Sequence, residues 1–215
     1  NTAFAEIGGT AAGSGNRIAC NGADGYASAS SSAATAVLGN SFYGNGGLAI
    51  DIDDDGVTPN DPGDGDPWRD NYPTIASAVQ NGANALVQGG LDAAANANFR
   101  LEFFSDSSCD ASGYGEGRNY LGFVAVGTDA KGHANFSASL PGVVAGQKLS
   151  ATATILIGSE PFLDYNSSEF SACATVVAAP SAPIAANNGP ICTRQTLSLT
   201  ASAITGASYA WTGPN

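Results

Sequence analysis

Short runs of alternating apolar and polar residues fill the middle of the chain. An alternation with a period of two residues predicts β-strands with one buried face. Turn residues such as Gly, Pro, Asp and Asn separate the runs, and residues 129–132 (Asp-Ala-Lys-Gly) predict a tight hairpin between two of them. About seven short strands at this spacing favour an Ig-like β-sandwich. The clearest runs are residues 85–87, 99–104, 120–126, 134–140, 149–157 and 173–177.

A sequence repeat precedes these runs. Residues 15–22 read Gly-Asn-Arg-Ile-Ala-Cys-Asn-Gly, and 24 residues later, residues 39–46 read Gly-Asn-Ser-Phe-Tyr-Gly-Asn-Gly. A period in the low twenties, with Gly and Asn at sharp corners, is typical of β-solenoid coils whose short strands stack. We therefore expect Asn16 to stack on Asn40, or Asn21 on Asn45. The alternative is two coincidental Gly-Asn turns in a Gly-rich chain.

Both patterns resemble known proteins. Apart from Cys20, where Gly is usual, five stretches resemble the last coils of secreted bacterial right-handed parallel β-helix (pectate-lyase-like) proteins: residues 7–10, 15–18, 38–45 (Leu-Gly-Asn-Ser-Phe-Tyr-Gly-Asn), 48–52 and 56–64. The β-sandwich that follows such helices is similar to residues 99–104, 109–117, 120–122, 128–132 and 168–173. The first strands of PKD-type, Ig-like domains of bacteroidete type resemble residues 192–201 and 207–215. The resemblance implies an architecture and says little about chemistry.

We accordingly predict an all-β chain of four segments. They are terminal β-helix coils with an acidic junction loop (1–72), an Ig-like β-sandwich (73–178), a linker rich in Pro, Ala and Asn (179–190) and an incomplete Ig-like or PKD-type domain (191–215). We expect the chain to be a slice of a longer protein, or a subunit with two open ends. The predicted partners at both ends are neighbouring domains or copies of the chain, joined by coil stacking or strand donation.

The charge and the cysteines narrow the setting. Seven Lys and Arg face 19 Asp and Glu, a net charge of −12 with no basic cluster, which disfavours nucleic acid as a partner. No stretch approaches the ~20 apolar residues of a membrane-spanning helix, so we expect no membrane insertion. Four cysteines in a chain with only 12% charged residues favour an extracellular, disulfide-bonded protein. Cys109 and Cys173 fall in one predicted sandwich and are the expected pair.

Acidic residues concentrate in the junction loop. Seven Asp lie between residues 51 and 66, and Asp at alternate positions before a Gly is how calcium loops gather oxygen ligands. Pro62 stands where an EF-hand would place Glu, so this is not an EF-hand. A solvated acidic turn is the alternative to calcium. The candidate Ca2+ ligands are Asp51, Asp53, Asp55, Asp61 and Asp64.

The sequence offers no catalytic set. His133 is the one histidine, and two coils build no extended groove for a glycosidase or a lyase. We therefore predict no catalytic residue and no cofactor beyond Ca2+. The predicted function is that of an extracellular structural or adhesive segment of a large bacterial surface protein or filament, with surface glycans as a further partner. The alternative is the ancillary C-terminal region of a secreted β-helix carbohydrate-active enzyme.

Overall fold

The computed structural model describes residues 5–28, 35–62, 64–65, 69–156, 166–204 and 208–210. These residues form strands β1 to β15 and no helix, so the all-β prediction is confirmed for the described part of the chain. The chain divides into two compact units, Asn1–Ala178 and Ala179–Asn215.

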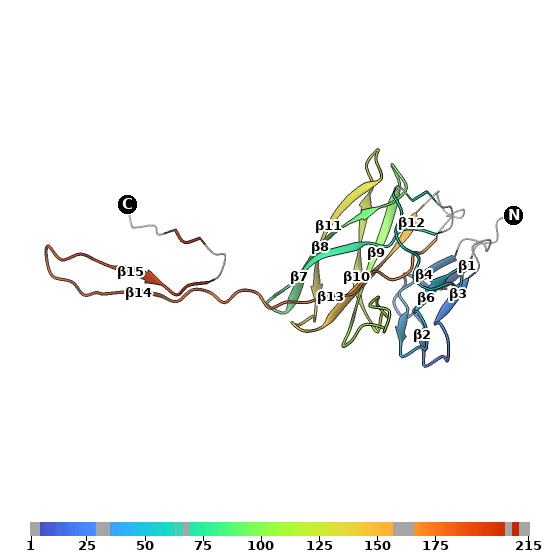
Figure 1. Ribbon diagram of the computed structural model, residues 1–215, viewed down its shortest axis with the longest axis horizontal. Helices are drawn as coiled ribbons and strands as arrows, with labels where there is room; N and C mark the ends of the chain where they lie inside the picture. Colours follow the sequence, from blue (N-terminus) through green and yellow to red (C-terminus); the bar gives the residue numbers. More distant parts are fainter. Residues whose placement is uncertain are drawn as a thin grey trace. The chain divides into compact units, whose positions relative to one another are not determined.

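The first six strands pair in parallel, two by two (Figure 1). In chain order they are β1 (Ala5–Gly8), β2 (Arg17–Ala19), β3 (Tyr26–Ser28), β4 (Thr35–Leu38), β5 (Ser41–Tyr43) and β6 (Ile50–Ile52). β1 pairs with β4, β2 with β5 and β3 with β6. Residues 5–28, here called the first coil, therefore lie along residues 35–52, called the second coil.

Both predicted asparagine stacks are present between the coils. The Oδ1 atom of Asn40 accepts hydrogen bonds from the backbone N–H and the side-chain amide of Asn16, at 2.9 and 3.1 Å. Asn45 does the same for Asn21, at 3.3 and 2.9 Å. In each stack the two residues are 24 positions apart, as the sequence repeat predicts.

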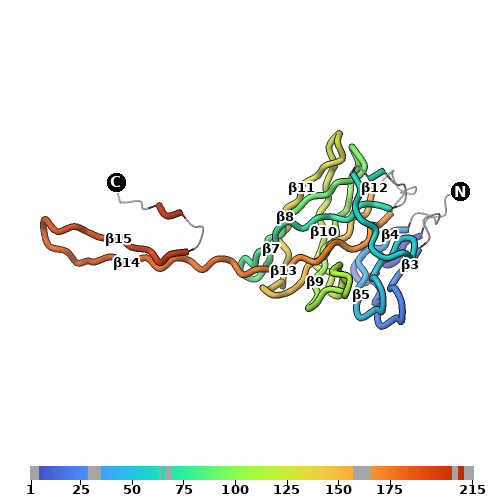
Figure 2. The backbone as a smooth tube through the Cα atoms, in the orientation of Figure 1, coloured from blue at the N-terminus to red at the C-terminus, as the bar shows by residue number. Residues whose placement is uncertain are grey.

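Two antiparallel sheets follow the coils in the first unit. One sheet has the order β11-β8-β7 and the other the order β10-β9-β12-β13. The strands are β7 (Thr74–Asn81), β8 (Asn84–Asp92), β9 (Asn98–Asp106), β10 (Asn119–Gly127), β11 (His133–Pro141), β12 (Lys148–Leu156) and β13 (Ala174–Thr175). Apolar side chains from both sheets, such as the fully buried Val87, Phe99 and Leu149, form one core, so the sheets pack face to face (Figure 2).

The hairpin predicted at residues 129–132 is wrong. Asp129 and Gly132 do form a tight turn, in which the Gly132 N–H donates to the Asp129 carbonyl at 3.0 Å. The strands on either side belong to different sheets, however, because β10 pairs with β9 and β11 pairs with β8. The turn bonds instead to the neighbouring crossover, where Asn96 donates to Asp129 and Ala93 donates to Gly132. Two sheet-to-sheet crossovers therefore support each other at this end.

The described residues of the second unit form one antiparallel pair, β14 (Ala185–Asn187) with β15 (Leu199–Ala201). β14 falls within residues 179–190, which we expected to be a linker rich in Pro, Ala and Asn. Ile184 and Ser202 extend the pairing, since the Ser202 N–H donates to the Ile184 carbonyl at 3.0 Å. Residues 205–207 and 211–215 of the predicted last domain lie outside the described residues.

Candidate functional site

The most elaborate polar site of the described chain lies at the outer edge of the second coil. One edge of this coil pairs with the first coil, and its other edge would leave backbone N–H groups unpaired. Side chains and backbone from the second of the two sheets and its loops meet these groups. We call the five residues that do so the cap: Glu102, Glu116, Gly117, Ser167 and Glu169.

Glu102 lies in the middle of β9 and is fully buried. Its Oε2 accepts the N–H of Gly39 at 2.8 Å, and its Oε1 accepts the Nε–H of Arg100 at 2.8 Å. Alternation along β9 directs Phe99 and Leu101 into the core and Arg100 and Glu102 to the opposite face. The coils cover that face, which explains why a glutamate in a regular strand is buried.

Glu116 and Gly117 extend from the loop between β9 and β10. The Glu116 carboxylate accepts the N–H groups of Gly44 and Asn45 at 2.5 and 2.9 Å. Gly117 exchanges two backbone hydrogen bonds with Phe42, at 3.0 and 3.1 Å. A Cβ at Gly117 would lie 2.6 Å from the Phe170 ring, so glycine is required for this close approach.

Residues 167 and 169 complete the cap on the other two strands of the coil. The Ser167 Oγ accepts the N–H of Val37 at 2.9 Å, and the Ser167 N–H donates to Thr35 at 3.1 Å. The buried Glu169 carboxylate accepts the N–H groups of Ile52 and Thr58, both at 2.9 Å. All three strands of the second coil are therefore bonded to the cap.

A second apolar core lies beneath the cap. The rings of Phe42 and Phe170 are 5.9 Å apart, and those of Phe104 and Phe170 are 5.0 Å apart, both in edge-to-face contact. Ile50 and other buried side chains of the second coil join this cluster. Residues 1–72 and 73–178, predicted as separate segments, thus share a core within one compact unit.

Burial and hydrogen bonding act in opposite directions on the cap carboxyls. Burial raises the pKa of Glu102 above its ordinary value, while the Gly39 N–H and the Arg100 guanidinium offset part of that rise. Burial also raises the pKa of Glu169, against the opposing bonds from Ile52 and Thr58. Burial therefore disfavours the ionised form of these two glutamates, and the N–H groups that bond to their carboxylates favour it.

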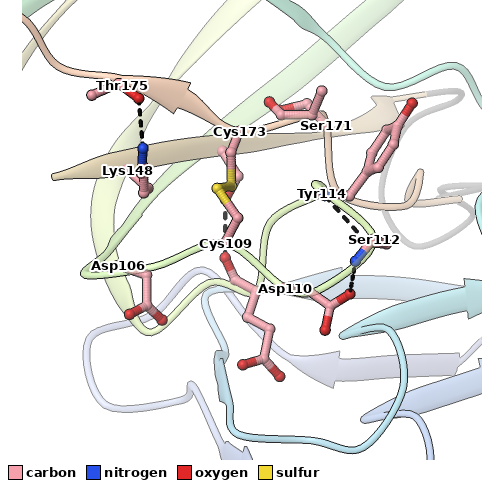
Figure 3. The surroundings of a disulfide bond; sticks show 12 residues. Asp106, Cys109, Asp110, Ser112, Tyr114, Lys148, Ser171, Cys173 and Thr175 are labelled. Carbon is pink, nitrogen blue, oxygen red and sulfur yellow. Dashed lines mark hydrogen bonds between the residues drawn. A yellow bond between two sulfur atoms is a disulfide. The ribbon is translucent and has the colours of Figure 1, made fainter.

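The predicted disulfide between Cys109 and Cys173 is present (Figure 3). It joins the loop that carries Glu116 to the segment that carries Glu169. These two segments are also joined by backbone hydrogen bonds. The Cys173 N–H donates to the Gly113 carbonyl at 3.1 Å, and the Gly115 N–H donates to the Ser171 carbonyl at 3.0 Å. Cys20 and Cys192 are free and exposed. The disulfide thus links the two segments that carry Glu116 and Glu169, whereas Glu102 is held by β9.

The structure does not bring the five predicted calcium ligands together. Asp53 and Asp55 form ion pairs with Arg69, the second at 3.6 Å. Asp61 accepts the N–H of Gly65, and Asp64 accepts the N–H of Asn71 at 3.0 Å. Asp66 lies outside the described residues.

Asp51 belongs to a different acidic group. Its carboxylate, buried in β6, lies with those of Asp24 and Asp54, and each offers an oxygen within 4.8 Å of the others. The Asp51 oxygens accept the N–H groups of Asp55 and Gly56, and burial raises the pKa of Asp51. Asp24 was missed because it is distant from Asp51 in sequence. The 24-residue repeat nevertheless places Ala27, three residues after Asp24, beside Asp51.

Sequence reasoning also missed the three cap glutamates. Glu102 lies in a run that the alternation assigned to a strand, and Glu116 lies in the loop between two such runs. The available signal was the spacing of Arg100 and Glu102, which lie two residues apart on one face of the strand. Charged side chains are seldom buried unless they are paired, so such a pair is compatible with a face that another element covers.

Among the described residues, none forms a helix long and apolar enough to cross a membrane. Comparison with known proteins finds no family model and no curated sequence that matches the chain.

Proposed function

We propose that this chain is an extracellular structural or adhesive segment of a bacterial surface protein or filament, in which the sandwich closes one end of a stack of parallel β-helix coils. The two coils would be the last of that stack, and residues 73–178 an Ig-like module fused to it. The proposal rests chiefly on the cap, whose carboxylates accept backbone N–H groups at the edge of the second coil.

Several features of the chain support this proposal. The Cys109–Cys173 disulfide suits an oxidising compartment. Parallel pairing at a 24-residue offset is the geometry of a solenoid, and solenoid ends need a polar cover to remain soluble. The buried carboxylates of Glu102 and Glu169 accept backbone N–H groups of the second coil and its flank, which favours a structural over a catalytic use.

The cap also limits how copies could assemble. Head-to-tail coil stacking needs two free coil edges, and the outer edge of the second coil is bonded to Glu102, Glu116 and Glu169. We therefore propose that coil stacking takes place at the first coil alone. Strand donation to the second unit, around β14 and β15, stays a separate route for the C-terminal side.

The alternative function is an ancillary region of a secreted carbohydrate-active enzyme. One observation favours it: a hollow of about 740 Å³ over β7, β8 and β11, lined in part by Asn60, Asp92, His133 and Asn135. Such polar side chains suit hydroxyl groups of a glycan. The described lining offers no Phe, Tyr or Trp ring on which a sugar could stack, which weighs against this use.

Affinity electrophoresis of the full chain through gels that contain soluble polysaccharides separates a purely structural role from carbohydrate binding. The structural proposal predicts unchanged mobility and no release of sugar products. Retardation that Asn135→Ala abolishes, with exposed Ser139→Ala as the matched control on the same strand, would contradict a purely structural role and assign carbohydrate binding to this hollow.

A further inference from the structure

The first coil has an open edge. Within the described residues, β1, β2 and β3 each have one strand neighbour, in the second coil. Asn16 and Cys20 bond to that coil through their backbones, at 2.8 and 3.3 Å. Because alternate residues of a strand direct their N–H groups to opposite edges, Arg17 and Ala19 direct theirs to the open one.

The apolar interior of the coils also ends incompletely at this edge. Three register pairs form it: Ile7 with Val37, Ile18 with Phe42, and Tyr26 with Ile50. The second-coil member of each pair is at most 4% exposed, whereas the first-coil member is only half-buried. A further layer would cover the first-coil residues as the first coil and the cap cover the second.

The asparagine stacks specify what that layer must provide. In each stack the second-coil Oδ1 accepts two N–H groups from the first-coil asparagine. The amides of Asn40 and Asn45 donate in turn to the carbonyls of Ile7 and Ile18, at 2.7 and 3.2 Å. The Oδ1 atoms of Asn16 and Asn21 accept no hydrogen bond from a described residue. They stand where the next pair of asparagines would donate.

We infer that the open edge binds a parallel β-coil that carries asparagines five positions apart, in the pattern Gly-Asn-x-apolar-x-x-Asn-Gly. The inference rests on the proposed function, which leaves this edge as the one site for coil stacking. A second copy of this chain does not fit the same register, because its complementary edge, that of the second coil, is bonded to the cap.

The test duplicates residues 15–38 in tandem within the full chain, which adds one coil in the register of the repeat. In the inner copy, amide exchange at Arg17 and Ala19 is expected to slow by ~10-fold or more relative to the unmodified chain. The matched control carries Asn16→Asp and Asn21→Asp in the outer copy alone. It removes the amide donors and is expected to lose most of that protection.

Three results would overturn the inference. One is exchange at the inner Arg17 and Ala19 as fast as in the unmodified chain. Another is a duplicated chain that fails to fold. The third is a dimer of the unmodified chain in which Arg17 and Ala19 are already protected, since a second copy would then cover the edge. Protection of Gly39 and Gly44 reports separately on the cap: if these amides exchange rapidly in the unmodified chain, the proposed function fails as well.

Discussion

The two edges of the coil pair have the same backbone pattern and opposite surroundings. At the second coil, three glutamates, one serine and one glycine satisfy the edge and bury its apolar interior. At the first coil, Arg17 and Ala19 face outward and Ile18 is half-buried. The difference indicates that the edge of a coil is closed by acceptors held at fixed positions, and that the sheet β10-β9-β12-β13 and its loops provide those positions here.

The largest expected effect comes from removing a buried cap acid. Glu102→Ala leaves the Gly39 N–H and the Arg100 guanidinium without their acceptor, so we expect a loss of about 3–5 kcal/mol in the free energy of unfolding. Urea denaturation measures this loss. The matched control is Glu6→Ala on the exposed face of the first coil, expected to stay within about 0.5 kcal/mol. Equal effects of the two changes would erase the contrast between the edges.

Removing the disulfide tests how the cap is held. We expect the double variant Cys109→Ser with Cys173→Ser to lose about 2–4 kcal/mol, because the unfolded chain gains freedom. Amide exchange should accelerate at Gly44 and Asn45, which bond to the disulfide-anchored loop. Exchange at Arg17 and Ala19 should not change. A uniform acceleration at all four residues would mean that the disulfide does not act through the cap.

The asparagine stacks sharpen the comparison within the coils. Asn40 is buried and serves both Asn16 and Ile7, so Asn40→Ala is expected to cost about 1–3 kcal/mol. Asn16 is exposed, and Asn16→Ala is expected to cost about 0.5 kcal/mol. Thermal denaturation of the two variants measures the difference. A larger cost at Asn16 would contradict the assignment of the first coil as the open side.

Calcium is expected to have a smaller effect. If the group around Asp51 holds Ca2+, the melting temperature should rise by about 2–4 °C, the shift that ~1 kcal/mol of binding gives a chain of this size. Asp54→Asn should remove the rise, and Asp110→Asn, in an exposed loop, should keep it. A melting temperature that ignores both Ca2+ and chelator would leave the solvated acidic turn as the account of this segment.

The pH dependence of stability is a further consequence of the cap. The pKa values of Glu102 and Glu169 are raised in the fold, so their contribution is full below the ordinary glutamate value of 4.5. It is lost as pH rises through the raised values. Asp129, whose pKa is lowered by bonds from His133 and Lys131, acts in the opposite direction below 3.8. We therefore expect the urea midpoint to fall as pH rises above 4.5.

The variant Glu169→Gln is the check on this pH dependence. It removes one of the titrating groups and should flatten the fall of the urea midpoint with pH. An unchanged slope would show that Glu169 keeps the same pKa in the folded and unfolded chains.

Local patterns in the sequence were sufficient for most strands of the two antiparallel sheets, for the asparagine stacks and for the disulfide. The alternation at residues 99–104 and the Gly-Asn repeat each report contacts whose spacing the backbone geometry fixes. The pairing partners of β10 and β11 could not be predicted. The turn sequence at residues 129–132 is compatible both with two strands that pair and with two strands that belong to different sheets. β7 was also not recognised as a separate run.

The cap could not be predicted because its contacts join distant parts of the chain. Glu102 and Gly39 are 63 residues apart, and Glu169 and Ile52 are 117 apart. No local periodicity relates such positions, and a glutamate in an alternating strand is ordinarily exposed. Asp24 is an intermediate case, since the 24-residue repeat places it near Asp51 once the coils are accepted.

Amide hydrogen exchange of the unmodified chain tests the central claim most directly. The comparison is between the amides at the capped edge, Gly39, Asn45 and Ile52, and those at the open edge, Arg17 and Ala19. The account predicts that the capped amides exchange slowly, near the rate set by global unfolding, and that the open ones exchange much faster. Equal rates at the two edges would contradict it.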